Sequence, residues 1–253
     1  MRKLQEISWI RIGAEGIAIV VSILLAFWIQ AWWDDKQLRE NERVILESLL
    51  TELSTTQNRL RFMGSFAGGI RDSSTQLLQA AIGPEVQLSD KEIDRLLGDT
   101  TWYVPLDHLD TPELDSLVSS DDLGLISNAQ LKRMLSTWPH KVRAARVLIA
   151  NDFHFFTDSY LPYLHMNTSF QQIINGAMHQ PGNSGIVWPG TEMALKEVVS
   201  HRELLSDRYF QNLLSQRISW ITEILDFGPR DRQIELDEIV TLIEMELERN
   251  FAD

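Results

Sequence analysis

A run of mostly apolar residues from Ile12 to Trp33 constrains this chain more than any other feature. A helix that crosses the roughly 30 Å hydrocarbon core of a bilayer needs about 20 such residues. Trp9 precedes the run and Trp32 and Trp33 end it, which places tryptophans at both membrane interfaces, where they are enriched. The run therefore predicts a transmembrane helix over residues 12–33, with Trp9, Trp32 and Trp33 as interfacial anchors.

A cleaved signal peptide is the alternative interpretation, because Arg2 and Lys3 precede the run. The apolar part of a signal peptide is usually 7–15 residues long and ends at a small-residue cleavage site. This run is longer and ends in tryptophans. The sequence therefore favours a retained anchor.

The orientation of the anchor follows from the flanking basic residues. Cytoplasmic flanks carry more Lys and Arg, and the counts on the two sides are nearly equal: Arg2, Lys3 and Arg11 before the run, and Lys36, Arg39 and Arg43 after it. The N-terminal flank has no acidic residue before Glu6. We therefore predict a short cytoplasmic tail (residues 1–11), a single span of the inner (plasma) membrane, and a C-terminal domain in the periplasm of a bacterium.

Charge and cysteine content exclude several classes of partner and site. The formal net charge of −13 argues against a nucleic-acid partner, because phosphate binding depends on clustered Lys and Arg. The same charge argues against a domain that lies flat on anionic lipid. The absence of cysteine excludes disulfides and thiolate metal sites. The bilayer itself is the predicted partner.

The chain after the anchor has the pattern of an amphipathic helix. Apolar positions recur at steps of three and four residues from Leu38 onward, with Glu42 in the same row: Leu38, Glu42, Ile45, Leu46, Leu49, Leu53 and Leu60. Glycines at 64, 68 and 69 predict a weak point, and Gly83-Pro84 predicts the end. Residues 34–83 are therefore predicted to form a stalk helix.

Residues 84–253 contain further helix signals and no strand pattern of useful length. Helix starts are predicted by Ser89-Asp90-Lys91-Glu92, Thr111-Pro112-Glu113, Ser127-Asn128 and Ser200-His201. Helix ends or kinks are predicted at Gly98, Pro139, Pro162 and Gly228-Pro229, and an irregular segment at 167–190. The predicted fold is all-α: an N-terminal transmembrane helix that continues into a stalk, followed by a soluble antiparallel helical bundle.

A row of small and polar residues on the predicted span indicates a face for helix association. Small side chains allow close approach of helices in lipid, and polar ones supply interhelical hydrogen bonds. The candidate face consists of Ala14, Glu15, Ala18, Ser22, Ala26 and Gln30. Glu15 has two interpretations: a headgroup-level pair with Arg11, four residues earlier, or an interhelical hydrogen bond in an oligomer.

Candidates for chemistry are few. His154 and Asp158 are four residues apart in a helical segment, with Asp152 and His165 nearby, and this spacing suits a metal ligand pair. The surrounding aromatic residues favour an aromatic core patch instead. No P-loop, zinc-protease or serine-hydrolase motif occurs. We therefore predict no catalytic residues, no cofactor and no metal, with His154 and Asp158 as weak candidates, and an enzyme is the least favoured class.

Two segments resemble an uncharacterised bacterial family of single-pass membrane proteins. The first is the anchor, Glu15-Gly16-Ile17-Ala18-Ile19 through Phe27, followed by Trp32-Trp33-Asp34. The second is Leu114-Asp115-Ser116-Leu117, followed by Leu123-Gly124-Leu125-Ile126. The family usually has Gly-Glu at the start of its span and Ser-Gly before the second element, where this chain has Ala14-Glu15 and Ser120-Asp121. The resemblance covers about a fifth of the chain and implies an integral membrane protein without a known activity.

Three classes of function follow from these patterns. The favoured one is a membrane-anchored helical scaffold that self-associates through its anchor and stalk or holds another membrane protein. The second is an extracytoplasmic ligand-sensing domain that signals to a membrane partner, and a small molecule bound in a pocket beneath residues 167–190 would favour it. The third is an enzyme.

Overall fold

The computed structural model describes residues 9–83, 87–105, 109–120, 122–178 and 197–251, with side chains from Ile19 onward up to Asn250. This described part is helical and contains no strand. Eight α-helices make it up: α1 (Trp9–Ile82), α2 (Asp90–Asp99), α3 (Pro112–Ser119), α4 (Ala129–Phe155), α5 (Leu161–Asn167), α6 (Phe170–Met178), α7 (Arg208–Leu225) and α8 (Asp231–Phe251). The predicted all-α helical bundle is confirmed.

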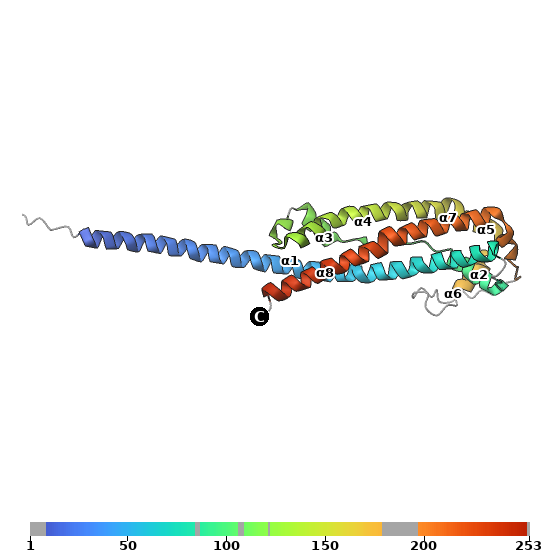
Figure 1. Cartoon of the computed structure of the whole chain (residues 1–253), viewed down its shortest axis with the longest axis horizontal. Helices are drawn as coiled ribbons and strands as arrows, with labels where there is room; N and C mark the ends of the chain where they lie inside the picture. Colours follow the sequence, from blue (N-terminus) through green and yellow to red (C-terminus); the bar gives the residue numbers. More distant parts are fainter. Residues whose placement is uncertain (1–8, 84–86, 106–108, 121, 179–196, 252–253) are drawn as a thin grey trace, which may run out of the picture.

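The first helix, α1, is a single element of 74 residues. Its first half projects from the bundle and its second half forms part of it (Figure 1). The weak point predicted at the glycines from Gly64 to Gly69 is absent, because α1 continues through them, whereas its end before Gly83 agrees with the prediction. Predicted span and stalk are thus one continuous helix.

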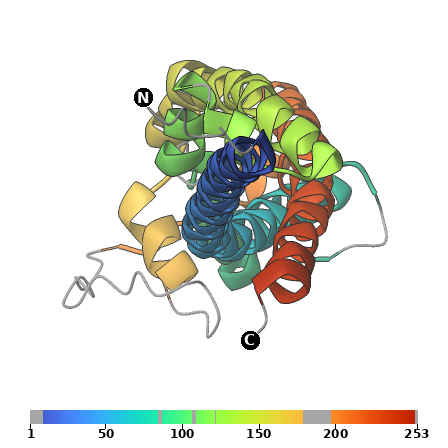
Figure 2. The same cartoon turned by 90° about the vertical axis from the view of Figure 1, so that its left-hand side faces the viewer.

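The bundle is not antiparallel throughout. The chain returns along the bundle after α2, so that α4 runs in the same direction as α1, and α7 and α8 run back against both (Figure 1). Viewed along the projecting half of α1, α4 and α8 lie on two sides of it (Figure 2). The reason is that α2 lies at one end of the bundle and α3 at the other (Figure 1), so the chain has already returned before α4 begins.

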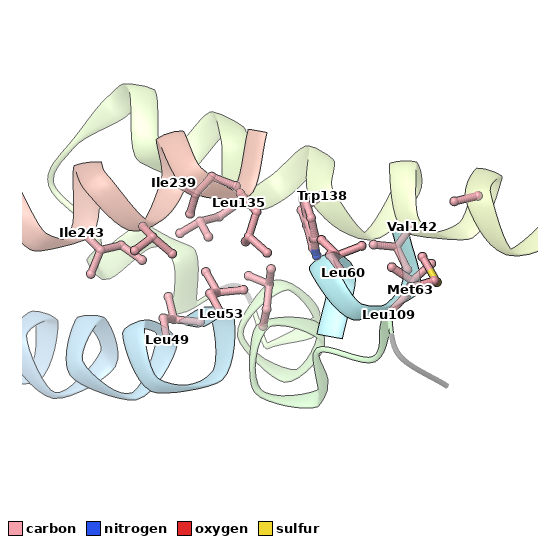
Figure 3. Close-up of a cluster of buried hydrophobic side chains, with 14 of the residues drawn as sticks. Leu49, Leu53, Leu60, Met63, Leu109, Leu135, Trp138, Val142, Ile239 and Ile243 are labelled. Atoms are coloured by element: carbon pink, nitrogen blue, oxygen red, sulfur yellow. The ribbon is translucent and has the colours of Figure 1, made fainter. Parts of the chain in front are cut away.

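The larger of two hydrophobic clusters lies where α1, α4 and α8 meet. Figure 3 shows Leu49, Leu53, Leu60 and Met63 of α1 facing Leu135, Trp138, Ile239 and Ile243. Most of these side chains are fully buried. The three- and four-residue steps of the stalk pattern therefore place one face of α1 in the core, as an amphipathic helix requires.

A second hydrophobic cluster lies at the far end of the bundle, which is the end away from the projecting half of α1. There α2 crosses α6. A Cβ at Gly98 would lie 2.1 Å from the backbone oxygen of Ile173, and one at Gly176 would lie 3.0 Å from the backbone nitrogen of Arg95. Gly98 was expected to end α2, but the helix continues to Asp99. The glycine instead allows the close approach of the two helices.

A turn of π-helix lies at or just before two of the predicted breaks. Pro162 was expected to end the long helix, but the chain passes through η3 (Phe156–Tyr160) into α5. Gly228-Pro229 was expected to separate the last two helices, but η5 (Asp226–Arg230) joins α7 to α8. A π-turn inserts an extra residue into a helix, and in both places the chain continues as helix through the predicted break.

Candidate functional site

The projecting half of α1 is the most unusual surface of the described structure. Every residue from 19 to 41 is exposed. Large apolar side chains point to all sides of this helix, with exposed fractions between 50% for Ile23 and 68% for Phe27. Soluble monomers rarely expose a continuous apolar surface of this kind, and such surfaces mark contact with a membrane or a partner.

Side chains are described for only part of the predicted span. Among the residues that the structure describes, no helix is both long enough and apolar enough to cross a membrane. The side chains of residues 12–18, and with them Ala14, Glu15 and Ala18 of the predicted association face, lie outside the described part, as does the side chain of Trp9. The remaining face residues, Ser22, Ala26 and Gln30, are exposed on the projecting helix.

The two other predicted interfacial anchors lie at the end of the apolar segment. Trp32 and Trp33 are 53% and 60% exposed, with ring centroids 6.5 Å apart. The Lys36 ammonium lies 5.7 Å from the centroid of the Trp32 ring. A cation beside an amphipathic ring is an arrangement suited to a membrane interface.

Two acidic side chains of α1 attach the bundle to this helix. The backbone N–H groups of Glu113 and Leu114 donate to Glu52 at 2.9 and 3.0 Å. These amides belong to the first turn of α3, whose N-cap residue Thr111 makes no side-chain capping bond. A carboxylate at a helix N-terminus satisfies free donors and opposes the positive end of the dipole. Glu52 therefore caps α3 from a distant part of the chain.

Glu42 binds the residue that precedes the N-cap of α4. Its carboxylate accepts hydrogen bonds from the Ser127 N–H at 2.6 Å and the Ser127 hydroxyl at 2.7 Å. The next residue, Asn128, caps α4 as predicted and donates to Glu246 of α8 at 2.7 Å. This polar collar, Glu42, Ser127, Asn128 and Glu246, ties α1, α4 and α8 together where α1 enters the bundle.

A buried ion pair lies deep in the bundle. The Arg217 guanidinium donates to Asp152 at 2.5 Å, and the two side chains are 0% and 1% exposed. Arg217 also donates to the Trp102 carbonyl and lies 4.9 Å from the Phe156 ring centroid. Burial raises the pKa of the Asp152 carboxyl, and the Arg217 charge opposes that rise. The pair joins α4, α7 and the segment after α2 that contains Trp102.

Tyr160 extends this network toward α2. Its hydroxyl donates to the Thr100 hydroxyl at 2.7 Å, and both side chains are fully buried. Burial raises the pKa of Tyr160 to about 12. No local pattern in the sequence marks these polar contacts, since they join residues more than 50 positions apart.

His201 forms a second polar cluster at the far end. Its Nδ1 lies 2.6 Å from Asp94, and its Nε2 accepts the Ser169 N–H at 2.9 Å. Gln172 also donates to Asp94, at 2.6 Å. Ser200-His201 was expected to cap a long helix, but η4 (Arg202–Ser206) follows it and Asp207 caps α7 instead. These hydrogen bonds connect α6 and His201 to α2.

The weak metal candidates have other contacts in the structure. Asp152 faces Arg217, and the His165 ring packs on Phe170 with centroids 4.2 Å apart. His154 contacts Phe153, and Asp158 accepts a hydrogen bond from Thr157. Within the described ranges, no group of three or more His, Asp or Glu side chains could hold a metal ion.

Comparison with known proteins gives no relative. No family model matches the chain, and neither a curated protein nor a solved structure does.

Proposed function

We propose that this chain is a single-pass protein of a bacterial inner membrane, which holds a helical bundle outside the cytoplasm as a scaffold for self-association or for another membrane protein. The observation that carries the proposal is the apolar surface of residues 19–33, exposed on all sides of α1. A helix that is hydrophobic all round is stable against acyl chains or against other helices.

The continuity of α1 supports a scaffold role. The same helix that bears the apolar segment forms a face of the main core, and Glu42 and Glu52 fasten α4 and α3 to it. A stiff helix shared by anchor and bundle holds the bundle at a set distance and orientation from whatever surrounds the anchor.

Lysine substitution tests the membrane anchor. Leu24→Lys with Phe27→Lys places two charges near the centre of the predicted span, and each charge costs about 2.5–3.5 kcal/mol there. We expect this variant to leave the membrane fraction on alkaline extraction. The matched control, Leu38→Lys with Val44→Lys, alters two apolar positions of the same helix that are also exposed, at 53% and 58%, and should remain in the membrane. Equal extraction of the two variants would count against the anchor.

Topology and association need separate measurements. Alkaline phosphatase fused after Asp253 should be active in a bacterial host, and an inactive fusion would reverse the proposed orientation. Native mass spectrometry of the full chain in detergent should show a homo-oligomer or a co-purifying membrane protein. A monomer without a partner would contradict the scaffold role.

Ligand sensing is the second candidate function. A ligand pocket beneath residues 167–190 would favour this function; in that segment Phe170–Met178 forms α6, and residues 179–190 lie outside the described part. The observation that favours sensing lies elsewhere: a groove of about 490 Å³ between α1 and the junction of α7 with α8. Its volume falls within the usual range for small-molecule sites.

A further inference from the structure

The groove lies between η5 and two glycines of α1. Its lining residues come from α1, the end of α7, η5 and the start of α8: Leu60, Arg61, Gly64, Ser65, Gly68, Arg71, Leu225, Pro229, Arg230, Gln233 and Ile234. A Cβ at Gly64 would lie 3.2 Å from Pro229, whereas one at Gly68 would meet nothing within 4 Å. The helices are therefore close at Gly64 and leave free space one turn later.

The groove combines an apolar floor with an apolar rim. Leu60, Leu225 and Pro229 are buried beneath it, and Ile234 at its edge is 67% exposed. An exposed isoleucine beside an apolar depression loses water contact when a ligand covers it, which is a favourable change. The surface suits an apolar molecule or chain.

Among the residues that the structure describes, three arginines and no acidic residue line the groove. Arg61, Arg71 and Arg230 contribute guanidinium groups in a chain with 36 acidic and 23 basic residues, so the charge of the lining residues is opposite in sign to that of the whole molecule. Such a site attracts an anion by charge complementarity, and a guanidinium can bind a carboxylate through two parallel hydrogen bonds.

The present partners of these arginines are weak competitors. Arg230 pairs with Asp226 at 2.8 Å, and the two side chains are 66% and 48% exposed. Arg61 lies 3.8 Å from Asp237, and Arg71 pairs with its neighbour Asp72. Exposed pairs of this kind contribute about 0–1 kcal/mol, so a bound carboxylate can replace them.

From this combination we infer that the groove binds a free single-chain amphipathic carboxylate of the fatty-acid class, with its chain on Leu60, Leu225 and Ile234 and its carboxylate at the arginines. A lipid within the bilayer does not reach the site under the proposed topology, because Gly64 follows Trp33 by 31 residues, about 46 Å along the helix. The ligand would contact α1 and η5 together. It would thereby fix the angle between α1 and the helix formed by α7, η5 and α8. Its biological use rests on the second candidate function, ligand sensing.

Equilibrium dialysis of radiolabelled laurate against the full chain tests the site. The chain is held in phosphatidylcholine nanodiscs, with empty discs as the blank, or in plain buffer if it does not insert. We expect one saturable site per chain. Arg61→Gln with Arg71→Gln and Arg230→Gln should weaken binding at least tenfold. The matched control changes three exposed arginines outside the groove, Arg133→Gln with Arg143→Gln and Arg208→Gln, and should bind as the parent chain does.

A pair of glycine variants tests the position. Gly68→Trp fills the open space and should abolish binding, whereas Gly69→Trp, the adjacent residue outside the lining, should not. Circular dichroism confirms that each variant is folded, and the arginine variants decide the matter if a tryptophan variant is not. Dodecyltrimethylammonium, a cation with the same chain, should not bind.

Three results would overturn the inference: no laurate binding above the blank, equal binding in the two triple variants, or equal binding of the cationic amphiphile. Native mass spectrometry with and without laurate separates the site from its use. Saturable binding without any change in stoichiometry or partner would leave the site in place and count against ligand sensing.

Discussion

The projecting half of α1 and the half inside the bundle belong to one uninterrupted helix, yet their sequences solve different problems. From residue 42 onward, apolar side chains occur at steps of three and four, and polar ones take the outer face, so the helix buries one side only. From residue 19 to 33, apolar residues follow one another directly and leave no face for water. Backbone continuity therefore gives no information about surroundings, whereas the period of the apolar pattern does.

The two regions also use charge differently. In the bundle, carboxylates have partners that are distant in the sequence: Asp152 pairs with buried Arg217, Glu42 accepts from Ser127, and Glu52 accepts from the first turn of α3. On the projecting half, Arg39 pairs with Asp35 at 2.9 Å with side chains 66% and 59% exposed. Exposed pairs contribute little, and buried ones are costly to break. The same residue types therefore matter structurally only inside the bundle.

Breaking the buried pair should produce the largest effect. Asp152→Ala leaves the Arg217 charge buried without its partner and should lower the free energy of unfolding by about 3–5 kcal/mol. Asp35→Ala removes an acid from the exposed pair and should change it by less than about 1 kcal/mol. Urea unfolding followed by circular dichroism measures both. Similar losses would mean that the projecting half folds together with the bundle.

A pair of leucines sharpens the comparison with uncharged residues. Leu53 is fully buried, and Leu24 is 62% exposed. Leu53→Ala should cost about 2–5 kcal/mol through lost burial and the cavity left behind, whereas Leu24→Ala should leave bundle unfolding unchanged. Thermal unfolding of the two variants checks this, and a cost at Leu24 would reveal packing against a second chain.

These residues also show how far sequence reasoning reaches. The helix end before Gly83, the Ser89 capping box and the Asn128 cap depend on neighbours within four positions, so local rules predict them. The core face of α1 follows from its periodicity. Gly228-Pro229 was wrongly predicted to break the helix, because a rule based on neighbouring residues takes no account of distant packing. In η5, Pro229 packs against Gly64, which is far away in the sequence.

The candidate sites were harder to predict for the same reason. The sequence indicated the apolar run and its flanking tryptophans directly, since a span is a local property. Glu42 was placed correctly on the inner face of α1, but its hydrogen bonds are to Ser127, a partner 85 residues away. The arginine-lined groove joins residues near 60–71 to residues near 225–234. No local pattern marks such a juxtaposition.

Alkaline pH should weaken the bundle through Tyr160. Its pKa is raised from 10.0 to about 12 in the folded chain. Below about pH 10 the phenol is protonated in both states and its contribution is fully present. Between about pH 10 and 12 the unfolded chain loses the proton first, so up to about 3 kcal/mol of stability is lost.

The Tyr160→Phe variant isolates this effect, because burial raises the pKa of Tyr163 as well, so part of the alkaline loss belongs to that residue. We expect the unfolding free energy of Tyr160→Phe to fall less steeply above pH 10 than that of the parent chain. Parallel curves would show that Tyr160 ionises without regard to folding.

A smaller loss is expected at the cap that Glu52 provides. Glu52→Gln keeps the shape but removes the charge facing the first turn of α3, and should cost about 0.5–2 kcal/mol. Glu40→Gln makes the same change on the exposed projecting half and should cost nothing measurable. Chemical unfolding separates the two, and an equal response would mean that the hydrogen bonds to Glu113 and Leu114 do not hold α3 in place.

The smallest effect is expected for association of the anchor, where the bundle plays no part. If the face that contains Ser22 and Ala26 packs against a second helix, Ser22→Leu with Ala26→Leu should push the backbones apart. A polar contact between helices in lipid contributes about 0.6 kcal/mol on average, so the loss of affinity should be a few-fold. Ile19→Leu with Ile23→Leu changes positions about 100° around the helix and should have no effect. Energy transfer between labelled chains in vesicles measures both pairs. If both leucine pairs associate like the parent chain, the small-residue row is not a contact face, and any oligomer must be held by the exposed surface of the bundle.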